Sequence, residues 1–101
     1  MNFDDVEFLN KEGKISDVTM GYCIDKALTD RAWYRRNLAI KHPNATAAHI
    51  DKALRDGNLG VRMAAIEHPN VTAAHIDKAL NDCSYVIRET AMRIKKERNL
   101  P

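Results

Sequence analysis

The chain has 101 residues, of which 45% are hydrophobic and 30% are charged, and its formal net charge at pH 7 is only +2. This composition is typical of one small globular domain. The charge is too small to indicate nucleic-acid binding by itself, and no apolar stretch is long enough to cross a bilayer.

The first 15 residues stand outside the pattern that governs the rest of the chain. The segment begins MNFDDVEFLNKEG, which is acidic and contains no apolar core of the kind found in a secretory signal. Its few apolar side chains are expected to cover one end of the domain. We therefore predict that residues 1–15 form an N-terminal cap.

The two cysteines bear on the compartment in which the protein works. Cys23 and Cys83 lie far apart, and they occupy positions that are not equivalent in the repeat described below. With no secretory signal in view, this pattern favours two reduced thiols. We expect an intracellular, cytoplasmic protein.

From residue 16 onward the sequence repeats with a period of 26 residues. Residues 42–54 read HPNATAAHIDKAL and residues 68–80 read HPNVTAAHIDKAL, so the two copies differ only at Ala45 and Val71. A fixed period of roughly 20–50 residues is typical of a solenoid, in which each unit buries its apolar face against the next. The predicted segments are repeats at 16–41, 42–67 and 68–93 and a C-terminal helical extension at 94–101.

The middle unit shows how the first half of a repeat is expected to fold. The residue before Pro43 is kept out of the α region, so the preceding helix should end there. Asn44 is expected to hold a tight turn, and Thr46 to cap the N-terminus of a first helix. That helix carries one apolar stripe at helical spacing, formed by Ala47, Ile50, Ala53 and Leu54.

A second helix is predicted over residues 59–67 of the same unit. A break at residues 56–58 precedes it, and either Asp56 or Asn58 is expected to be its cap. The helix is apolar on nearly all sides, which predicts that it is buried between its neighbours. The corresponding helix of the third unit should begin near Ser84, and its polar face is what a terminal repeat needs.

The second half of each unit carries a further pattern: an aspartate, four residues, an aliphatic residue, an arginine, two residues and an alanine. It occurs as Asp56, Val61, Arg62, Ala65 and again as Asp82, Ile87, Arg88, Ala91. This spacing resembles that of HEAT and HEAT-like repeats, and the His-Pro-Asn connection is similar to that of the variant leucine-rich repeats of bacteria. The resemblance covers about residues 16–93.

The resemblance implies a fold and a broad type of function. The fold class is all-α: a short right-handed α-solenoid of about three HEAT-like helical hairpins behind the N-terminal cap. Such folds bind proteins or nucleic acids and do not depend on an active site. We therefore expect a binding module.

If the units stack, equivalent residues fall into columns. One column contains Arg36, Arg62 and Arg88, and another contains Asp30, Asp56 and Asp82. The arginines either form a basic ladder for a phosphate backbone or bond to loop carbonyls and to the aspartates. Because arginine and aspartate recur together, the second interpretation is favoured.

The chain contains no pattern typical of catalysis or metal binding. All four histidines belong to the repeat, and equivalent ones should lie about 10 Å apart, which is too far for one metal to bridge. A Gly-rich phosphate loop and a nucleophile elbow are both missing from the sequence. We expect no enzyme activity and no cofactor.

The segment at residues 30–36, DRAWYRR, contains the only tryptophan. Tryptophan and arginine are the residue types most enriched in binding hot spots. Trp33 itself falls in one column with Leu59 and Tyr85, so we expect it in the core. Arg31 replaces a glycine and a cysteine of the later copies.

Arg35 departs from the residue pattern of the repeat. Its counterparts in the other two units are Val61 and Ile87, so this position favours an aliphatic side chain. An arginine there predicts that this end of the stack is exposed or engaged by a partner.

The leading interpretation is a small intracellular helical-repeat scaffold that binds another protein, as a regulator or inhibitor. The predicted contact residues are Arg31, Trp33, Tyr34, Arg35, Lys26, Lys52 and Lys78. One alternative is a nucleic-acid-binding module that contacts phosphates through arginine and lysine. Another is self-association through an incompletely capped end of the stack, which leaves monomer and weak dimer open. No membrane partner is expected.

Overall fold

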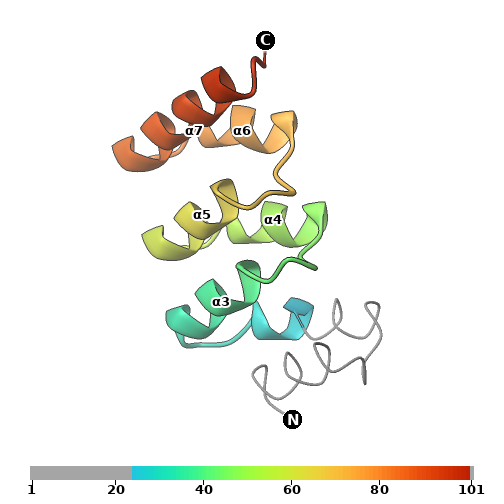
Figure 1. The fold of residues 1–101 in the computed structure, drawn as a ribbon. Coiled ribbons are helices and arrows are strands. Elements are labelled where there is room, and N and C mark those ends of the chain that lie inside the picture. The colour runs from blue at the N-terminus through green and yellow to red at the C-terminus, as the bar shows by residue number, and fades with distance from the viewer. Residues whose placement is uncertain (1–23, 101) are drawn as a thin grey trace.

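The computed structural model describes residues 24–100, which form helices joined by turns with no strand among them (Figure 1). One turn of helix at residues 24–27 comes first in this part of the chain. The labelled helices that follow are α3 (Trp33–Ile40), α4 (Ala47–Ala53), α5 (Leu59–Ile66), α6 (Ala73–Ala79) and α7 (Tyr85–Glu97). The all-α class is confirmed here, while the predicted cap at 1–15 lies outside the described residues.

The helices alternate between two layers (Figure 1). Helices α3, α5 and α7 lie side by side in one layer, with α5 in contact with both neighbours. The turn at 24–27, α4 and α6 form the other layer, in which α4 packs against α3 and α5, and α6 against α5 and α7. Segments one 26-residue period apart therefore lie next to each other in space.

In the second and third units the first helix begins after a threonine, as predicted for Thr46. The Thr46 hydroxyl accepts a hydrogen bond from the backbone N–H of His49 at 3.4 Å, and the Thr46 N–H donates to Nδ1 of His49 at 3.0 Å. The same reciprocal pair joins Thr72 and His75. This is a capping box in which histidine takes the place of the usual glutamate or glutamine.

In the second and third units the second helix begins where the sequence predicts. Asn58 caps α5, because its side chain accepts from the N–H of Val61 at 3.2 Å. Asp56 is not the cap; its carboxylate accepts from the N–H of Asn58 and tightens the preceding turn. Helix α7 begins after Ser84, and it extends to Glu97 because no proline interrupts it where the earlier units carry His-Pro.

Small and β-branched side chains fill the space between the layers. Helix α5 is buried as predicted along most of its length, with the exception of Leu59 at its start. Alanines on the facing sides let the helices approach closely. The largest fully buried side chains in the described residues are Ile24, Ile40, Ile50, Ile66, Ile76, Ile87 and Val61.

Hydrogen bonds from one unit to the next hold the His-Pro-Asn turns together. Nε2 of His68 donates to the carbonyl of His42 at 2.9 Å, and its Nδ1 accepts the N–H of Asn70 at 3.0 Å. The side-chain amide of Asn70 donates to the carbonyl of Ala45 at 3.0 Å. The buried imidazole of His68 therefore replaces water as a partner for turn backbone.

At the C-terminal end, an arginine performs the task that Asn70 performs inside the stack. Nη1 of Arg98 donates to the carbonyl of Val71 at 2.8 Å. Val71 is the counterpart of Ala45, whose carbonyl is bonded by Asn70. The tail after α7 therefore closes the turn side of the last unit.

Candidate protein-binding surface

The repeated arginines join neighbouring units. Nε and Nη2 of Arg36 donate to the two carboxylate oxygens of Asp56 at 2.7 and 3.1 Å. One unit later, Nε of Arg62 donates to Asp82 at 3.1 Å. Each arginine also bonds a loop carbonyl, that of Asp30 or of Asp56. The favoured interpretation of these columns is confirmed: these two arginines bind aspartates and carbonyls.

The Arg36–Asp56 pair shifts the pKa of both groups. Burial alone would raise the pKa of the Asp56 carboxyl, but hydrogen bonds from Arg36 and from the backbone of Asn58 outweigh it and lower the pKa below its ordinary value. The hydrogen bond to Asp56 in turn raises the pKa of the Arg36 guanidinium. Both groups are therefore held in their charged forms.

Arg88 is the third member of the column, and no described carboxylate pairs with it. Its Nη1 donates to the carbonyl of Asp82 at 2.6 Å, as its counterparts do in their own loops. Its guanidinium lies 5.9 Å from the centroid of the Tyr85 ring, within the range of a cation–π contact. The ladder of ion pairs thus ends at helix α7.

Three large apolar residues are exposed along one side of the molecule. Trp33, Leu59 and Tyr85 are the first residues of α3, α5 and α7, and they are 51%, 43% and 67% exposed. The helix starts that carry them lie in line in Figure 1. Tyr34 follows Trp33 and is also exposed. These four residues are called the aromatic edge below.

The expectation that Trp33 lies in the core is wrong. The residue opens its helix at the outer rim of the layer, and its neighbour on α5 is Gly60, which has no side chain. A Cβ built on Gly60 would lie 3.8 Å from Cζ3 of Trp33, so part of the indole covers this glycine while the rest faces solvent. Nearby, the side chain of Asn37 donates to the Gly60 carbonyl at 2.9 Å.

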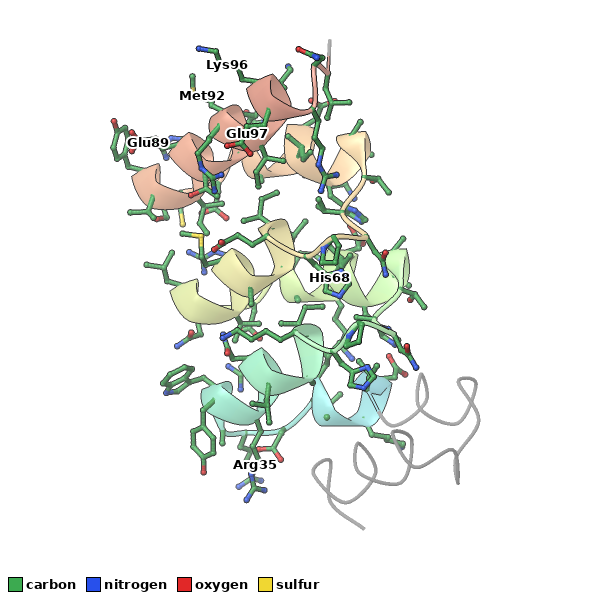
Figure 2. All side chains as sticks on the ribbon, in the orientation of Figure 1. Arg35, His68, Glu89, Met92, Lys96 and Glu97 are labelled. Atoms are coloured by element: carbon green, nitrogen blue, oxygen red, sulfur yellow. The ribbon has the colours of Figure 1, made fainter. Side chains whose placement is uncertain are left out.

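The structure brings the first four predicted contact residues together. Trp33 and Tyr34 meet edge to face with ring centroids 6.2 Å apart. Arg31 and Arg35 are exposed in the same segment, and Nη1 of Arg35 is 3.5 Å from Oδ2 of Asp30. Figure 2 shows the side chain of Arg35 pointing away from the stack. The side chain of Arg35 is 60% exposed, whereas its counterparts Val61 and Ile87 are fully buried.

The three predicted lysines lie elsewhere. Lys26, Lys52 and Lys78 are exposed on the helices of the other layer, away from the starts of α3, α5 and α7. Nζ of Lys78 is 2.6 Å from Asp51 of the preceding unit. Hydrogen bonding by this lysine lowers the pKa of the Asp51 carboxyl. On this face a lysine and an aspartate of neighbouring units pair, and it is not part of the aromatic edge.

Sequence reasoning did not select Leu59 and Tyr85 as contact residues. A signal was present, since their column changes from tryptophan to leucine to tyrosine, while two fully buried columns keep one residue type, isoleucine at 24, 50 and 76 and alanine at 39, 65 and 91. A column that tolerates three different large side chains does not fill a fixed space in the core. The variation in size along this column agrees with the exposure of its three residues.

No group of three or more histidine, cysteine or acidic side chains in residues 24–100 is placed to hold a metal ion. None of the helices in that range is long and apolar enough to span a membrane. No protein-family model matches the chain, and neither the curated proteins nor the solved structures contain a significant match to it.

Proposed function

We propose that this chain is a small helical-repeat scaffold that binds another protein through the aromatic edge. Its architecture is taken to be a short right-handed α-solenoid of HEAT-like hairpins, supported by the alternating layers and by the Arg36–Asp56 and Arg62–Asp82 pairs between units. The observation that carries the proposal is the exposure of three equivalent helix-start positions.

The residue types on the aromatic edge support binding. Trp33, Tyr34 and Tyr85 combine large apolar area with a polar group at one end, and such side chains dominate the energetics of interfaces. Exposed apolar residues that stand singly need no explanation, whereas a row of them marks a surface for a partner. Arg31 and Arg35 lie at one end of the row, where they can bond carboxylates at the polar rim of an interface.

The ion pairs formed by the arginine column favour a protein over a nucleic acid as the binding partner. A phosphate backbone would need several unpaired cations in a row. Arg36 and Arg62 instead donate to Asp56 and Asp82. A partner that meets mainly apolar edge residues is more consistent with a protein surface, and a scaffold of this kind acts as a regulator or inhibitor by occupying that surface.

The test compares two surfaces of the same protein. The full chain is immobilised and used to capture proteins from its native host, and the captured partner is then purified. The Trp33→Ser, Tyr85→Ser double variant is expected to weaken that partner's binding by about a hundredfold, as loss of two hot-spot side chains would. The matched control is the Lys52→Ser, Lys78→Ser variant on the other layer, which should leave the affinity within about threefold.

Two outcomes would contradict the proposal. One is full retention of the partner by the edge variant together with its loss from the lysine variant. The other is a captured species that nuclease removes and whose binding falls steeply with salt, which would establish the nucleic-acid alternative.

A further inference from the structure

Helix α7 carries an outward stripe that no described element covers. Glu89, Met92 and Lys96 are spaced by three and four residues, so they lie on one face of the helix. All three are exposed, and Met92 is 62% exposed. Figure 2 shows them along the side of α7 that faces away from the rest of the stack. These three residues are called the end stripe.

The repeat shows that this stripe corresponds to an interface. The counterparts of Met92 in the two earlier units are Ile40 and Ile66, and both are fully buried. Helix α5 packs on α3 and helix α7 packs on α5, which closes those positions. On α7 the same helical face is open, so an apolar side chain at an interface position is left in water.

The two charged side chains that flank Met92 form no ion pair within the described residues. Glu89 and Lys96 have no ion-pair partner there. Other charged residues of α7 do, since Arg93 lies 3.1 Å from Glu97 and Lys95 lies 3.9 Å from Asp77. One acidic and one basic side chain thus lie on either side of an exposed methionine, three residues before it and four after it.

We infer that a second copy of this chain binds the end stripe in a symmetric dimer. Two α7 helices placed antiparallel, with a twofold axis near Met92, bring Glu89 of each copy to Lys96 of the other. The two methionines then pack together at the centre. Twofold interfaces are self-complementary, so one acid–base pair in a single chain supplies two ion pairs in the dimer.

The alternative of head-to-tail stacking fits the structure less well. In head-to-tail stacking, the first unit of a second copy would place its turn against the turn at residues 68–71 of this copy. Arg98 already occupies the Val71 carbonyl that such a turn would bond. An antiparallel contact uses only the helix side of the last unit, which the tail leaves open.

The size of the contact sets the strength of the dimer. Helix α7 has 13 residues, and a helix of that length is about 20 Å long. A contact along one such helix is smaller than the ~1,600 Å² of a standard stable interface. The dimer is therefore weak, and it forms at high protein concentration.

The test is sedimentation equilibrium of the full chain at concentrations up to about 1 mM, where weak contacts of this kind are populated. The wild type is expected to show a reversible monomer–dimer equilibrium. Either single variant, Glu89→Lys or Lys96→Glu, turns both ion pairs of the dimer into pairs of like charge. Each should therefore weaken the dimer about tenfold or more. The double variant Glu89→Lys, Lys96→Glu restores opposite charges and should recover the wild-type association constant to within about threefold.

Further variants separate this inference from the proposed function. Met92→Asp should abolish the dimer, while Trp33→Ser, which removes an aromatic-edge residue remote from the stripe, should leave it unchanged. All of these positions are exposed, and circular dichroism of each variant shows whether it is folded. A wild type that remains monomeric throughout, or a double variant no stronger than the single ones, would overturn the inference whatever the outcome of partner capture.

Discussion

The two edges of the helical stack differ in how much their sequence varies between units and in how exposed their side chains are. On the turn edge the copies are nearly identical in sequence, and the side chains of His68 and Asn70 bond the backbone of the preceding turn at His42 and Ala45. On the aromatic edge, equivalent positions carry different side chains, as Trp33 and Tyr85 show, and these remain in solvent. In this comparison the unchanged turn residues hold neighbouring units together, whereas the varied helix-start residues are exposed to a partner.

The comparison extends to single columns that change character along the stack. Ile66 is fully buried, while Met92 at the equivalent position is exposed. The same repeat position thus contributes to the core in the second unit and is exposed for contact with a partner in the third. Substitutions at matched positions test this directly, because the side chains are similar in size and differ in what covers them.

The largest contrast is expected within that column. Ile66→Ala removes buried methyl groups and leaves a cavity, so the free energy of unfolding should fall by about 3 kcal/mol. Met92→Ala removes atoms that already lie in water and should change it by no more than about 0.5 kcal/mol at low protein concentration. Chemical denaturation of both variants measures the difference. Equal losses would show that the two positions are covered alike.

A smaller loss is expected on the turn edge. His68→Ala leaves the carbonyl of His42 and the N–H of Asn70 without their partners, which should lower the free energy of unfolding by about 2 kcal/mol. Lys52→Ala is the control, since its side chain is exposed on α4. Thermal unfolding followed by circular dichroism provides the measurement. A His68 variant as stable as the control would show that the turn bonds contribute nothing.

The smallest effect comes from the ion pairs between units, and it depends on pH. The Asp56 carboxyl has an ordinary pKa of 3.8, and in the folded chain its pKa is lower. Its stabilising contribution is therefore complete above the unfolded value and is lost as the pH falls from about 4 through the folded pKa. Denaturation midpoints between pH 5 and pH 2 should show this loss.

A substitution isolates the contribution of Asp56. The Asp56→Asn variant is expected to be less stable at pH 5 and to show a shallower decline with acid, because one titrating carboxylate has been removed. An identical acid profile in the variant and the wild type would assign the pH dependence to other groups, such as Asp51, whose pKa is also lowered.

Much of the fold follows from short-range signals in the sequence. Proline, the capping threonines and asparagine act within a few residues, so the starts of the helices at 47, 59 and 85 were predictable. The joint recurrence of arginine and aspartate also indicated the ion pairs between units. The role of His49 was not predicted, although the Thr46-x-x-His49 spacing matches that of a capping box.

The candidate site was less predictable because it depends on what lies across the layer. Helical spacing places Trp33 on the same side of α3 as residues further along the helix that are buried. Whether it is covered depends on its neighbour on α5, which is Gly60. Burial at a helix start is set by that contact between units, and a sequence period does not specify it.

The fluorescence of Trp33 tests the central claim most directly, because the chain contains only one tryptophan. The indole is half exposed, so the free protein should show the emission of a solvent-exposed tryptophan and should be readily quenched by acrylamide. Saturation with the captured partner should shift the emission to shorter wavelength and protect it from quenching, with the Lys52→Ser, Lys78→Ser variant behaving in the same way. Unchanged emission and quenching at saturation would show that the partner does not cover the aromatic edge, and the account of this protein's binding surface would be wrong.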